Sequence, residues 1–182
     1  MAADKKRVCV FCGSSRGIND DYAGAAEDMG RALLRRDLGL VFGGTAMGLM
    51  DVLADTVMAE GGEVIGIIPA NLLAREIGKL DITDLRVVET MHQRKQLMSD
   101  LSDGFVALPG GMGTFEELCE ILTWAQLGIH AKPVGLVNSA SYYEPLLTLF
   151  DHAVTEGFIA PTDRMLLKSA NTPDELLDAL GF

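Results

Sequence analysis

The sequence has little positive charge, few cysteines and no long apolar run, and each absence excludes a class of protein. Its 15 Lys and Arg residues against 26 Asp and Glu residues give a net charge of −11, which disfavours a nucleic acid polymer as partner. A single nucleotide is not excluded, because one phosphate needs only a local pocket. No apolar stretch approaches the ~20 residues of a membrane span, so we expect no membrane partner.

The amino-terminal segment also lacks the pattern of a secretory signal. Met1–Arg7 is short and charged, and the apolar run that follows it ends at Gly13. A signal peptide needs a longer apolar region behind its charged start. The three cysteines are an odd number, which argues against a disulfide framework. We therefore expect a cytoplasmic protein.

The cysteines and histidines do not form a redox or metal motif. Cys9 and Cys12 have C-x-x-C spacing, but they lie within and at the end of a strand-like run, whereas the redox motif opens a helix. We therefore interpret them as small buried side chains. His92, His130 and His152 are scattered without the spacing of metal ligands, so we expect no metal site.

Short apolar runs alternate with longer helical patterns throughout the chain. The runs expected to form strands are Arg7–Cys12, Leu38–Phe42, Glu63–Ile68, Leu85–Thr90, Gly104–Leu108 and Pro133–Asn138. The patterns expected to form helices are Asp20–Arg36, Thr45–Glu60, His92–Ser102, Thr114–Leu127, Tyr143–Glu156 and a last helix capped by Thr172. The central runs lack polar alternation, which is typical of strands covered on both faces. The sequence therefore predicts one α/β domain over residues 1–182, with a Rossmann-like open parallel sheet flanked by helices on both faces.

Three of the turns between a strand and the next helix are rich in glycine and other small residues. They are Gly13-Ser14-Ser15-Arg16-Gly17, Gly43-Gly44-Thr45-Ala46-Met47-Gly48 and Pro109-Gly110-Gly111-Met112-Gly113-Thr114. Parallel strands would present all three at one edge of the sheet, with N–H groups and helix N-termini directed outwards, which favours an anionic ligand. None matches G-x-G-x-x-G or the P-loop pattern. Glycines that merely permit tight turns explain any single turn, whereas three at one edge favour a ligand site.

The third turn continues into two carboxylates, Glu116 and Glu117. Thr114-Phe115-Glu116-Glu117 fits a capping box, in which Thr114 caps the helix and Glu117 reaches back to the Thr114 N–H. A carboxylate beside a phosphate-binding turn is electrostatically unfavourable unless it binds ribose, activates water or faces a cationic transition state. Both interpretations of Glu117 stay open.

A basic pair, Arg94 and Lys95, opens the helix that follows the strand Leu85–Thr90. Two cations at a helix N-terminus oppose the helix dipole, and a solvated basic patch is the simplest explanation. The preceding strand nevertheless points this helix start at the edge that carries the glycine turns. There Arg94 would clamp a phosphate bidentately or orient the carboxylate, and Lys95 would add a point charge.

Taken together, these motifs resemble the LOG (Lonely Guy) family of cytokinin riboside 5′-monophosphate phosphoribohydrolases, long mislabelled as lysine decarboxylases. The resemblance rests on M-x-x-R-K at Met91–Lys95 and P-G-G-x-G-T-x-x-E at Pro109–Glu117, which are highly specific as a pair. It covers roughly residues 7–160 and also includes Cys12–Ser15, Gly43–Met50, Ile67–Pro69, Arg75–Glu76 and Thr123–His130.

The resemblance implies hydrolysis of the N-glycosidic bond of a nucleoside 5′-monophosphate, such as a cytokinin riboside 5′-monophosphate or AMP, to a free base and ribose 5-phosphate. It implies a catalytic pair, Arg94 and Glu117, together with a homodimer and no metal or other cofactor. The substrate-contacting positions that it implies are Glu76, Arg94, Lys95, Gly111, Met112, Gly113, Thr114, Phe115, Glu116, Glu117 and Thr123. To these the glycine turns add Gly13, Ser14, Gly43, Gly44 and Thr45.

Two other functions fit parts of the same pattern. A protein that senses or carries a nucleotide or cofactor without cleaving it would show the same glycine turns, although Arg94 together with Glu117 favours an enzyme. A decarboxylase dependent on pyridoxal phosphate needs a Schiff-base lysine, and among the few lysines only Lys95 lies near the expected site. The sequence does not identify the preferred base, which we expect the irregular segment Pro69–Asp84 to help select.

Overall fold

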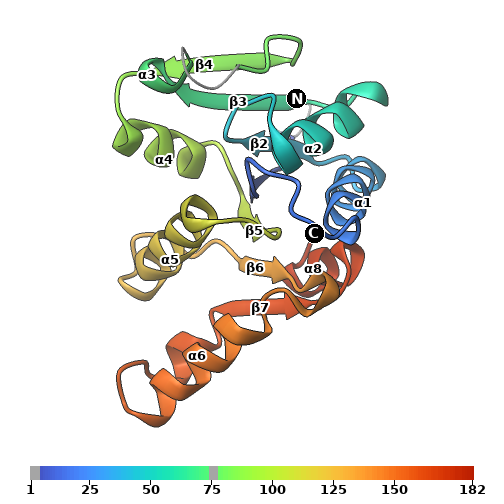
Figure 1. The fold of residues 1–182 in the computed structure, drawn as a ribbon. Coiled ribbons are helices and arrows are strands. Elements are labelled where there is room, and N and C mark those ends of the chain that lie inside the picture. The colour runs from blue at the N-terminus through green and yellow to red at the C-terminus, as the bar shows by residue number, and fades with distance from the viewer. Residues whose placement is uncertain (1–4, 74–77) are drawn as a thin grey trace.

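The computed structural model describes residues 5–73 and 78–182, and its centre is a seven-stranded sheet in the order β4-β3-β2-β1-β5-β6-β7 (Figure 1). Every pair of neighbouring strands is parallel. The strands are β1 Arg7–Phe11, β2 Gly39–Phe42, β3 Val64–Pro69, β4 Asp84–Val88, β5 Gly104–Ala107, β6 Val134–Val137 and β7 Leu167–Ala170. The α/β fold with an open parallel sheet is therefore confirmed, and β7 is a strand that the sequence did not predict.

Helices cover both faces of the sheet. They are α1 Asp21–Arg35, α2 Gly48–Ala59, α3 Ala70–Leu73, α4 Met91–Asp100, α5 Met112–Gln126, the 3-10 turn η1 Ser139–Ser141, α6 Glu144–Thr155, α7 Pro161–Arg164 and α8 Pro173–Leu180. Helices α1, α2 and α8 pack on one face, and α4, α5 and α6 lie on the other (Figure 1). Within β1, Val8 and Val10 belong to the first core, whereas Cys9 and Phe11 belong to the second, because successive strand side chains point to opposite faces.

The order of the strands places a crevice at β1. From β1 the chain builds outward through β2, β3 and β4 on one side, and then returns to add β5, β6 and β7 on the other. In open α/β sheets, ligands bind outside the carboxyl ends of the strands at such a switch point. The turns that follow β1 and β5 are the first and third glycine turns, so the topology brings them together.

The helix starts correct one prediction and confirm another. Helix α8 begins with a capping box between Thr172 and Glu175, as expected. Helix α5 begins at Met112 with Gly111 as its N-cap, so the predicted capping box between Thr114 and Glu117 is wrong. Gly111 lies in an extended conformation, which starts the helix three residues earlier than the T-x-x-E pattern implies. Glu117 therefore has no capping role.

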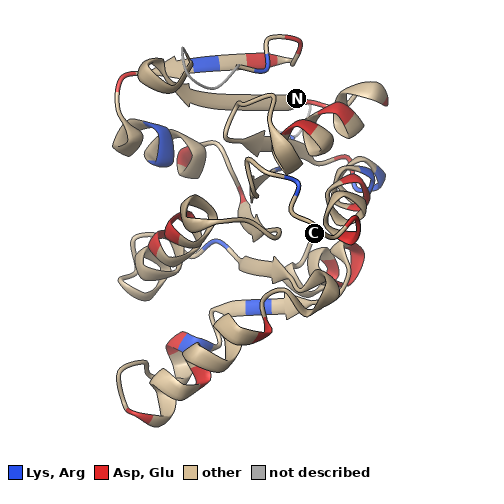
Figure 2. Cartoon of the chain, in the orientation of Figure 1, with Lys and Arg blue, Asp and Glu red and all other residues tan. Residues whose placement is uncertain are grey.

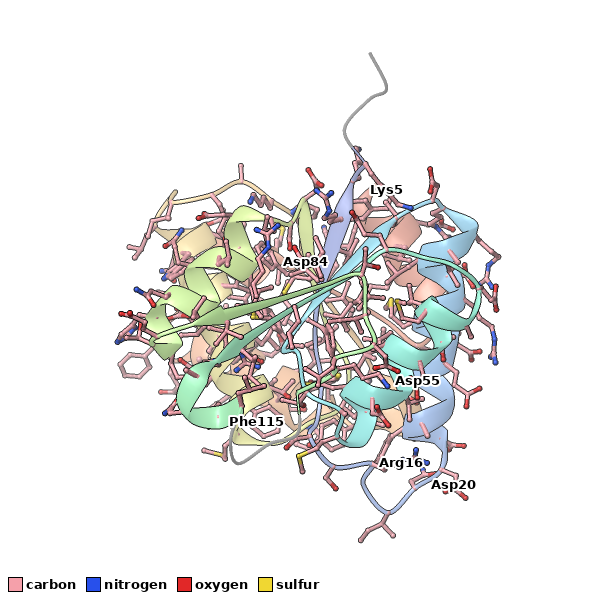
Figure 3. All side chains as sticks on the ribbon, turned by 90° about the horizontal axis from the view of Figure 1, so that it is seen from above. Lys5, Arg16, Asp20, Asp55, Asp84 and Phe115 are labelled. Carbon is pink, nitrogen blue, oxygen red and sulfur yellow. The ribbon has the colours of Figure 1, made fainter. Side chains whose placement is uncertain are left out.

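Charged positions occur along most of the helices and on some strands and loops (Figure 2). Acidic positions predominate, as the net charge of −11 requires. Seen from above the sheet, the loop between β1 and α1, with Arg16 and Asp20, projects at the rim of the molecule (Figure 3). Among the described residues, no helix combines the length and apolar character needed to cross a membrane.

Candidate active site

A cavity of about 200 Å³ lies at the carboxyl ends of β1, β2 and β5. It is lined by Val10, Phe11, Cys12, Gly13, Ser14, Gly43, Met50, Leu72, Arg94, Met98, Gly111, Met112, Gly113, Thr114 and Glu117. All three glycine turns contribute to this lining, as the parallel topology predicts. The cavity also joins them to Arg94 from α4 and Glu117 from α5.

The third glycine turn presents free backbone donors to this cavity. The N–H groups of Gly111, Met112 and Gly113 have no hydrogen-bond acceptor in the part of the chain that the structure describes. They are first-turn donors of α5, which a helix cannot satisfy internally. With the positive end of the helix dipole behind them, they form an anion-binding site. A Cβ at Gly110 would collide with the Thr114 hydroxyl, so the tight turn requires glycine there.

Arg94 is buried and fixed by main-chain oxygens. Its Nε donates to the Ile67 carbonyl oxygen at 3.0 Å and its Nη2 donates to the Gly43 carbonyl oxygen at 3.0 Å. Its Nη1 lies 3.5 Å from Oε1 of Glu117. These contacts hold the guanidinium against the ends of β2 and β3. Of the two roles expected for Arg94, the geometry favours orientation of the carboxylate over a bidentate phosphate clamp.

Glu117 is the buried carboxylate of the cavity, with a side chain that is 11% exposed. Burial raises the pKa of Glu117 to about 7, although the charge of Arg94 opposes this rise. The nearby Glu116 carboxylate adds to it. Perturbed carboxyl groups in a cleft are candidates for proton transfer at neutral pH. Because Glu117 does not cap α5, its position is better explained by a role in the chemistry of the cavity that it lines.

Lys95 connects two helices at the border of the site. Its Nζ donates to Oε1 of Glu116 at 2.5 Å and to Oε1 of Glu120 at 2.9 Å. These ion pairs join α4 to α5 and balance the basic charge near the start of α4. The structure therefore pairs Lys95 with carboxylates, and the role of Lys95 as a point charge for a phosphate stays a prediction.

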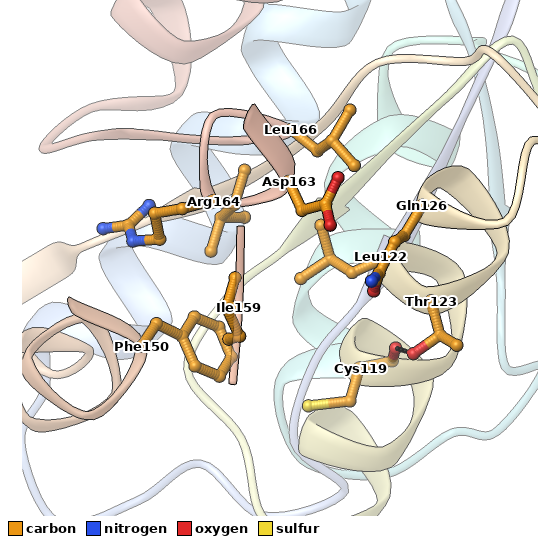
Figure 4. Close-up of a pocket in the computed structure, with 10 residues that line it drawn as sticks. Cys119, Leu122, Thr123, Gln126, Phe150, Ile159, Asp163, Arg164 and Leu166 are labelled. Atoms are coloured by element: carbon orange, nitrogen blue, oxygen red, sulfur yellow. Dashed lines mark hydrogen bonds between the residues drawn. The ribbon is translucent and has the colours of Figure 1, made fainter. Parts of the chain in front are cut away.

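Several expected site residues lie away from the lining of this cavity. Thr123 lines a separate cavity of about 140 Å³ between α5 and the α6–α7 segment, and its hydroxyl donates to the Cys119 carbonyl oxygen at 2.7 Å (Figure 4). Thr45, within the second turn, is fully buried. Gly44 has a φ of +77° and packs against Ile67 of β3. Glu76 lies outside the described residues.

Phe115, Cys9 and Cys12 pack in or against the hydrophobic cores on the two faces of the sheet. Phe115 packs its ring against the rings of Tyr142 and Tyr143. Cys9 and Cys12 are buried free thiols, which confirms the interpretation as small buried side chains. They belong to different cores because side chains three positions apart on a strand point to opposite faces. This geometry excludes a redox pair.

The sequence did not point to some residues that shape the site. Met50, Leu72 and Met98 line the cavity. Tyr142 donates a hydrogen bond to the Gly110 carbonyl oxygen in the third glycine turn, and Tyr143 donates one to the Leu108 carbonyl oxygen just before it. Their parent elements are distant in the sequence from the turn, and no local pattern predicts such contacts.

Comparison with known proteins agrees with this geometry. Residues 50–180 match a family model described as "Possible lysine decarboxylase". A cytokinin riboside 5′-monophosphate phosphoribohydrolase of Arabidopsis thaliana is 51% identical over 96% of this chain and 81% of its own length. A second Arabidopsis thaliana protein of the same name is 50% identical over 96% of this chain and 82% of its own length.

Solved structures show the same fold at lower identity. The molybdenum cofactor carrier protein of Chlamydomonas reinhardtii superposes with a TM-score of 0.71 at 19% identity, covering 96% of this chain and 95% of its own. The molybdenum cofactor binding protein of Rippkaea orientalis gives 0.72 at 20% identity, covering 98% and 96%. At this identity the likeness concerns the fold alone.

Proposed function

The chain belongs to the family of cytokinin riboside 5′-monophosphate phosphoribohydrolases, and from this membership and the site we propose that it hydrolyses nucleoside 5′-monophosphates. The substrates are cytokinin riboside 5′-monophosphates and AMP, and the products are the free base and ribose 5-phosphate. The observation that carries the proposal is Glu117, a buried carboxyl group beside Arg94 that faces the free N–H groups of a helix N-terminus.

Each part of the cavity has a role in this reaction. The N–H groups of Gly111, Met112 and Gly113 bind the 5′-phosphate. Cleavage of the bond between the ribose carbon C1′ and the base nitrogen passes through an oxocarbenium-like state, which an ionised Glu117 stabilises. Water adds its oxygen to C1′ and gives a proton to Glu117, and Glu117 returns that proton to the nitrogen of the departing base. A pKa near 7 suits a group that accepts and returns a proton at neutral pH.

Arg94 supports the ionised form of Glu117. Its side chain is 9% exposed, and its guanidinium is held in place by the carbonyl oxygens of Ile67 in β3 and of Gly43 just after β2. A fixed cation favours the charged state of a neighbouring carboxylate. Arg94 thereby keeps Glu117 available as a base although burial opposes its ionisation.

The lysines do not favour a pyridoxal phosphate enzyme, despite the description of the matching family model. A Schiff-base lysine attacks as the neutral amine and needs a lowered pKa. Burial alone would lower the pKa of Lys95, but hydrogen bonds to Glu116 and Glu120 outweigh it and raise the pKa. The same holds for Lys79, which Asp55 and Asp51 bind.

The proposal includes a homodimer of single-domain subunits, residues 1–182, in the cytoplasm. Helix α6 has no buried residue. Two large apolar side chains are exposed here, Leu149 on the helix at 58% and Phe158 just beyond it at 87%. A second copy that covers this face would remove both side chains from water. Three free thiols fit a reducing compartment.

The test is a panel of substrates with a phosphate control. AMP, GMP, CMP and isopentenyladenosine 5′-monophosphate are incubated with the protein, and free base is quantified by chromatography. Adenosine serves as the control because it has the same glycosidic bond without the phosphate that the helix N-terminus binds. We expect release of base from at least one nucleotide and far slower release from the nucleoside. Intact nucleotides throughout would contradict the proposal and leave a protein that only binds them.

A further inference from the structure

Three successive carbonyl oxygens accept hydrogen bonds where the third glycine turn begins. The Tyr143 hydroxyl donates to the Leu108 carbonyl oxygen at 2.6 Å. The Gly13 N–H donates to the Pro109 carbonyl oxygen at 3.0 Å. The Tyr142 hydroxyl donates to the Gly110 carbonyl oxygen. Three consecutive carbonyl groups, from Leu108 to Gly110, are therefore fixed in direction.

A planar trans peptide links the direction of each carbonyl to the direction of the next N–H. The two groups of one peptide unit point in opposite directions, and the described residues contain no cis peptide bond. Tyr142 holds the Gly110 carbonyl, so it also directs the Gly111 N–H away from itself. Tyr143 holds the Leu108 carbonyl, but the next residue is Pro109, which has no N–H to direct.

The turn borders two cavities. One, of about 220 Å³, is lined by Tyr142, Pro109, Gly110 and Gly111. The active-site cavity is also lined by Gly111, together with Met112 and Gly113 but without Tyr142 or Gly110. Because the Gly110 carbonyl points towards Tyr142, on the side of the first cavity, the N–H of the same peptide points to the opposite side, where Gly111 borders the active site.

The position of Tyr142 is itself strongly fixed. Its ring makes edge contacts with Tyr22 and Tyr143, with centroid distances of 5.5 and 5.0 Å. The chain reaches it through Ala140 and Ser141, two successive non-glycine residues with φ of +49° and +57°. Such conformations are unfavourable for residues with a Cβ and persist only where the surroundings impose them. The strained backbone at Ala140 and Ser141 therefore places the Tyr142 side chain against the third glycine turn.

We propose that Tyr142 is a positioning residue, whose hydroxyl aligns the Gly110–Gly111 peptide so that the Gly111 N–H binds the substrate's 5′-phosphate. The inference rests on the proposed function, since it assigns the phosphate to this turn. Loss of the hydroxyl leaves the peptide free to rotate, and it weakens a charge-assisted hydrogen bond to the phosphate. We expect about a ten-fold loss of phosphate affinity, the size of part of one such bond.

The adjacent tyrosine provides a matched control. Tyr142→Phe and Tyr143→Phe each keep the ring and remove one hydroxyl, from the carbonyl of Gly110 in the turn and from that of Leu108 just before it, respectively. Binding of ribose 5-phosphate is measured by calorimetry, and KM and kcat are measured with the best nucleotide. Tyr142→Phe should raise Kd and KM about ten-fold with little change in kcat. Tyr143→Phe should lower the melting temperature without changing Kd. Equal Kd values for Tyr142→Phe and the wild type would overturn the proposal.

A second variant tests the same N–H without removing the tyrosine. Gly111→Pro deletes the N–H, the φ of −99° at this position has the negative sign that proline requires, and a Cβ there meets no heavy atom within 4 Å. It should weaken ribose 5-phosphate binding, and Tyr142→Phe should add no further loss in this background. Additive losses would show that Tyr142 acts elsewhere. Since binding is measured without turnover, a wild type that binds ribose 5-phosphate but cleaves no nucleotide would refute only the proposed function.

Discussion

Replacement of Glu117 by glutamine should make the protein more stable at alkaline pH while it abolishes activity. The folded protein raises the pKa of Glu117 from the ordinary 4.5 to about 7, mainly through burial. Between these values the folded state keeps a proton that the unfolded chain releases. The stabilising contribution of the protonated group is therefore complete below pH 4.5 and is lost as the pH rises through 7.

The size of the effect follows from that difference in pKa. It corresponds to roughly 3 kcal/mol in the free energy of unfolding. Glutamine has nearly the shape of the protonated glutamic acid but never ionises, so the variant avoids this cost. At pH 8 the variant should exceed the wild type by roughly 3 kcal/mol, or roughly 10 °C in melting temperature for a chain of this size. Below pH 4.5 the two should have equal stability.

The assay combines unfolding with turnover. Urea unfolding of both proteins at several pH values between 4.5 and 8 gives the difference in free energy of unfolding, in which the other titrating groups cancel. Turnover of AMP by the variant should fall at least ~10²-fold, the usual contribution of a general base. If the difference in stability is the same at pH 4.5 and pH 8, the argument from burial of Glu117 fails.

Three further predictions concern the site, the fold and the assembly. The rate constant kcat/KM should rise with pH and level off above about 7, because only ionised Glu117 acts as base. Arg94→Gln should shift this rise to higher pH. A rise caused by ionisation of the substrate's phosphate would stay at the same pH in this variant. Thr172→Ala should lower the free energy of unfolding in urea by about 1 kcal/mol, because it removes the α8 cap, and should leave kcat and KM unchanged. If the protein forms the proposed homodimer, Phe158→Asp should convert it to a monomer in light scattering, whereas Ile18→Asp, at a position that is fully exposed on the loop between β1 and α1, should not.

The sequence predicts the fold well because buried parallel strands leave a strong local signal. Apolar runs mark the strands from β1 to β6, the central ones without polar alternation, and these strands form the predicted sheet. Strand β7 was not predicted, because it lies at the edge of the sheet and its sequence is not apolar. Its central residues, Lys168 and Ser169, are exposed. The end of the β4 run was predicted two residues too late, because Thr90 caps α4 in a capping box with Gln93.

The contents of the site are predicted less completely than its location. Glycine turns and charged residues identify the edge of the sheet where Arg94 and Glu117 meet. The start of α5 could not be read from T-x-x-E alone, since Gly111 takes over the N-cap. The partners of Arg94 are carbonyl oxygens, which every residue carries, and Tyr142 lies 32 residues from its acceptor. Such contacts depend on the tertiary arrangement, and no local sequence pattern predicts them.

The most direct test of the central claim is product analysis for the wild type and Glu117→Gln side by side. Each protein is incubated with isopentenyladenosine 5′-monophosphate and with AMP, and both the base and ribose 5-phosphate are quantified. The wild type should release the two products in equal amounts from at least one substrate, and the variant should bind that nucleotide but release almost none. Equal rates of release by the two proteins, or no release by the wild type, would contradict a hydrolase in which Glu117 acts as the base.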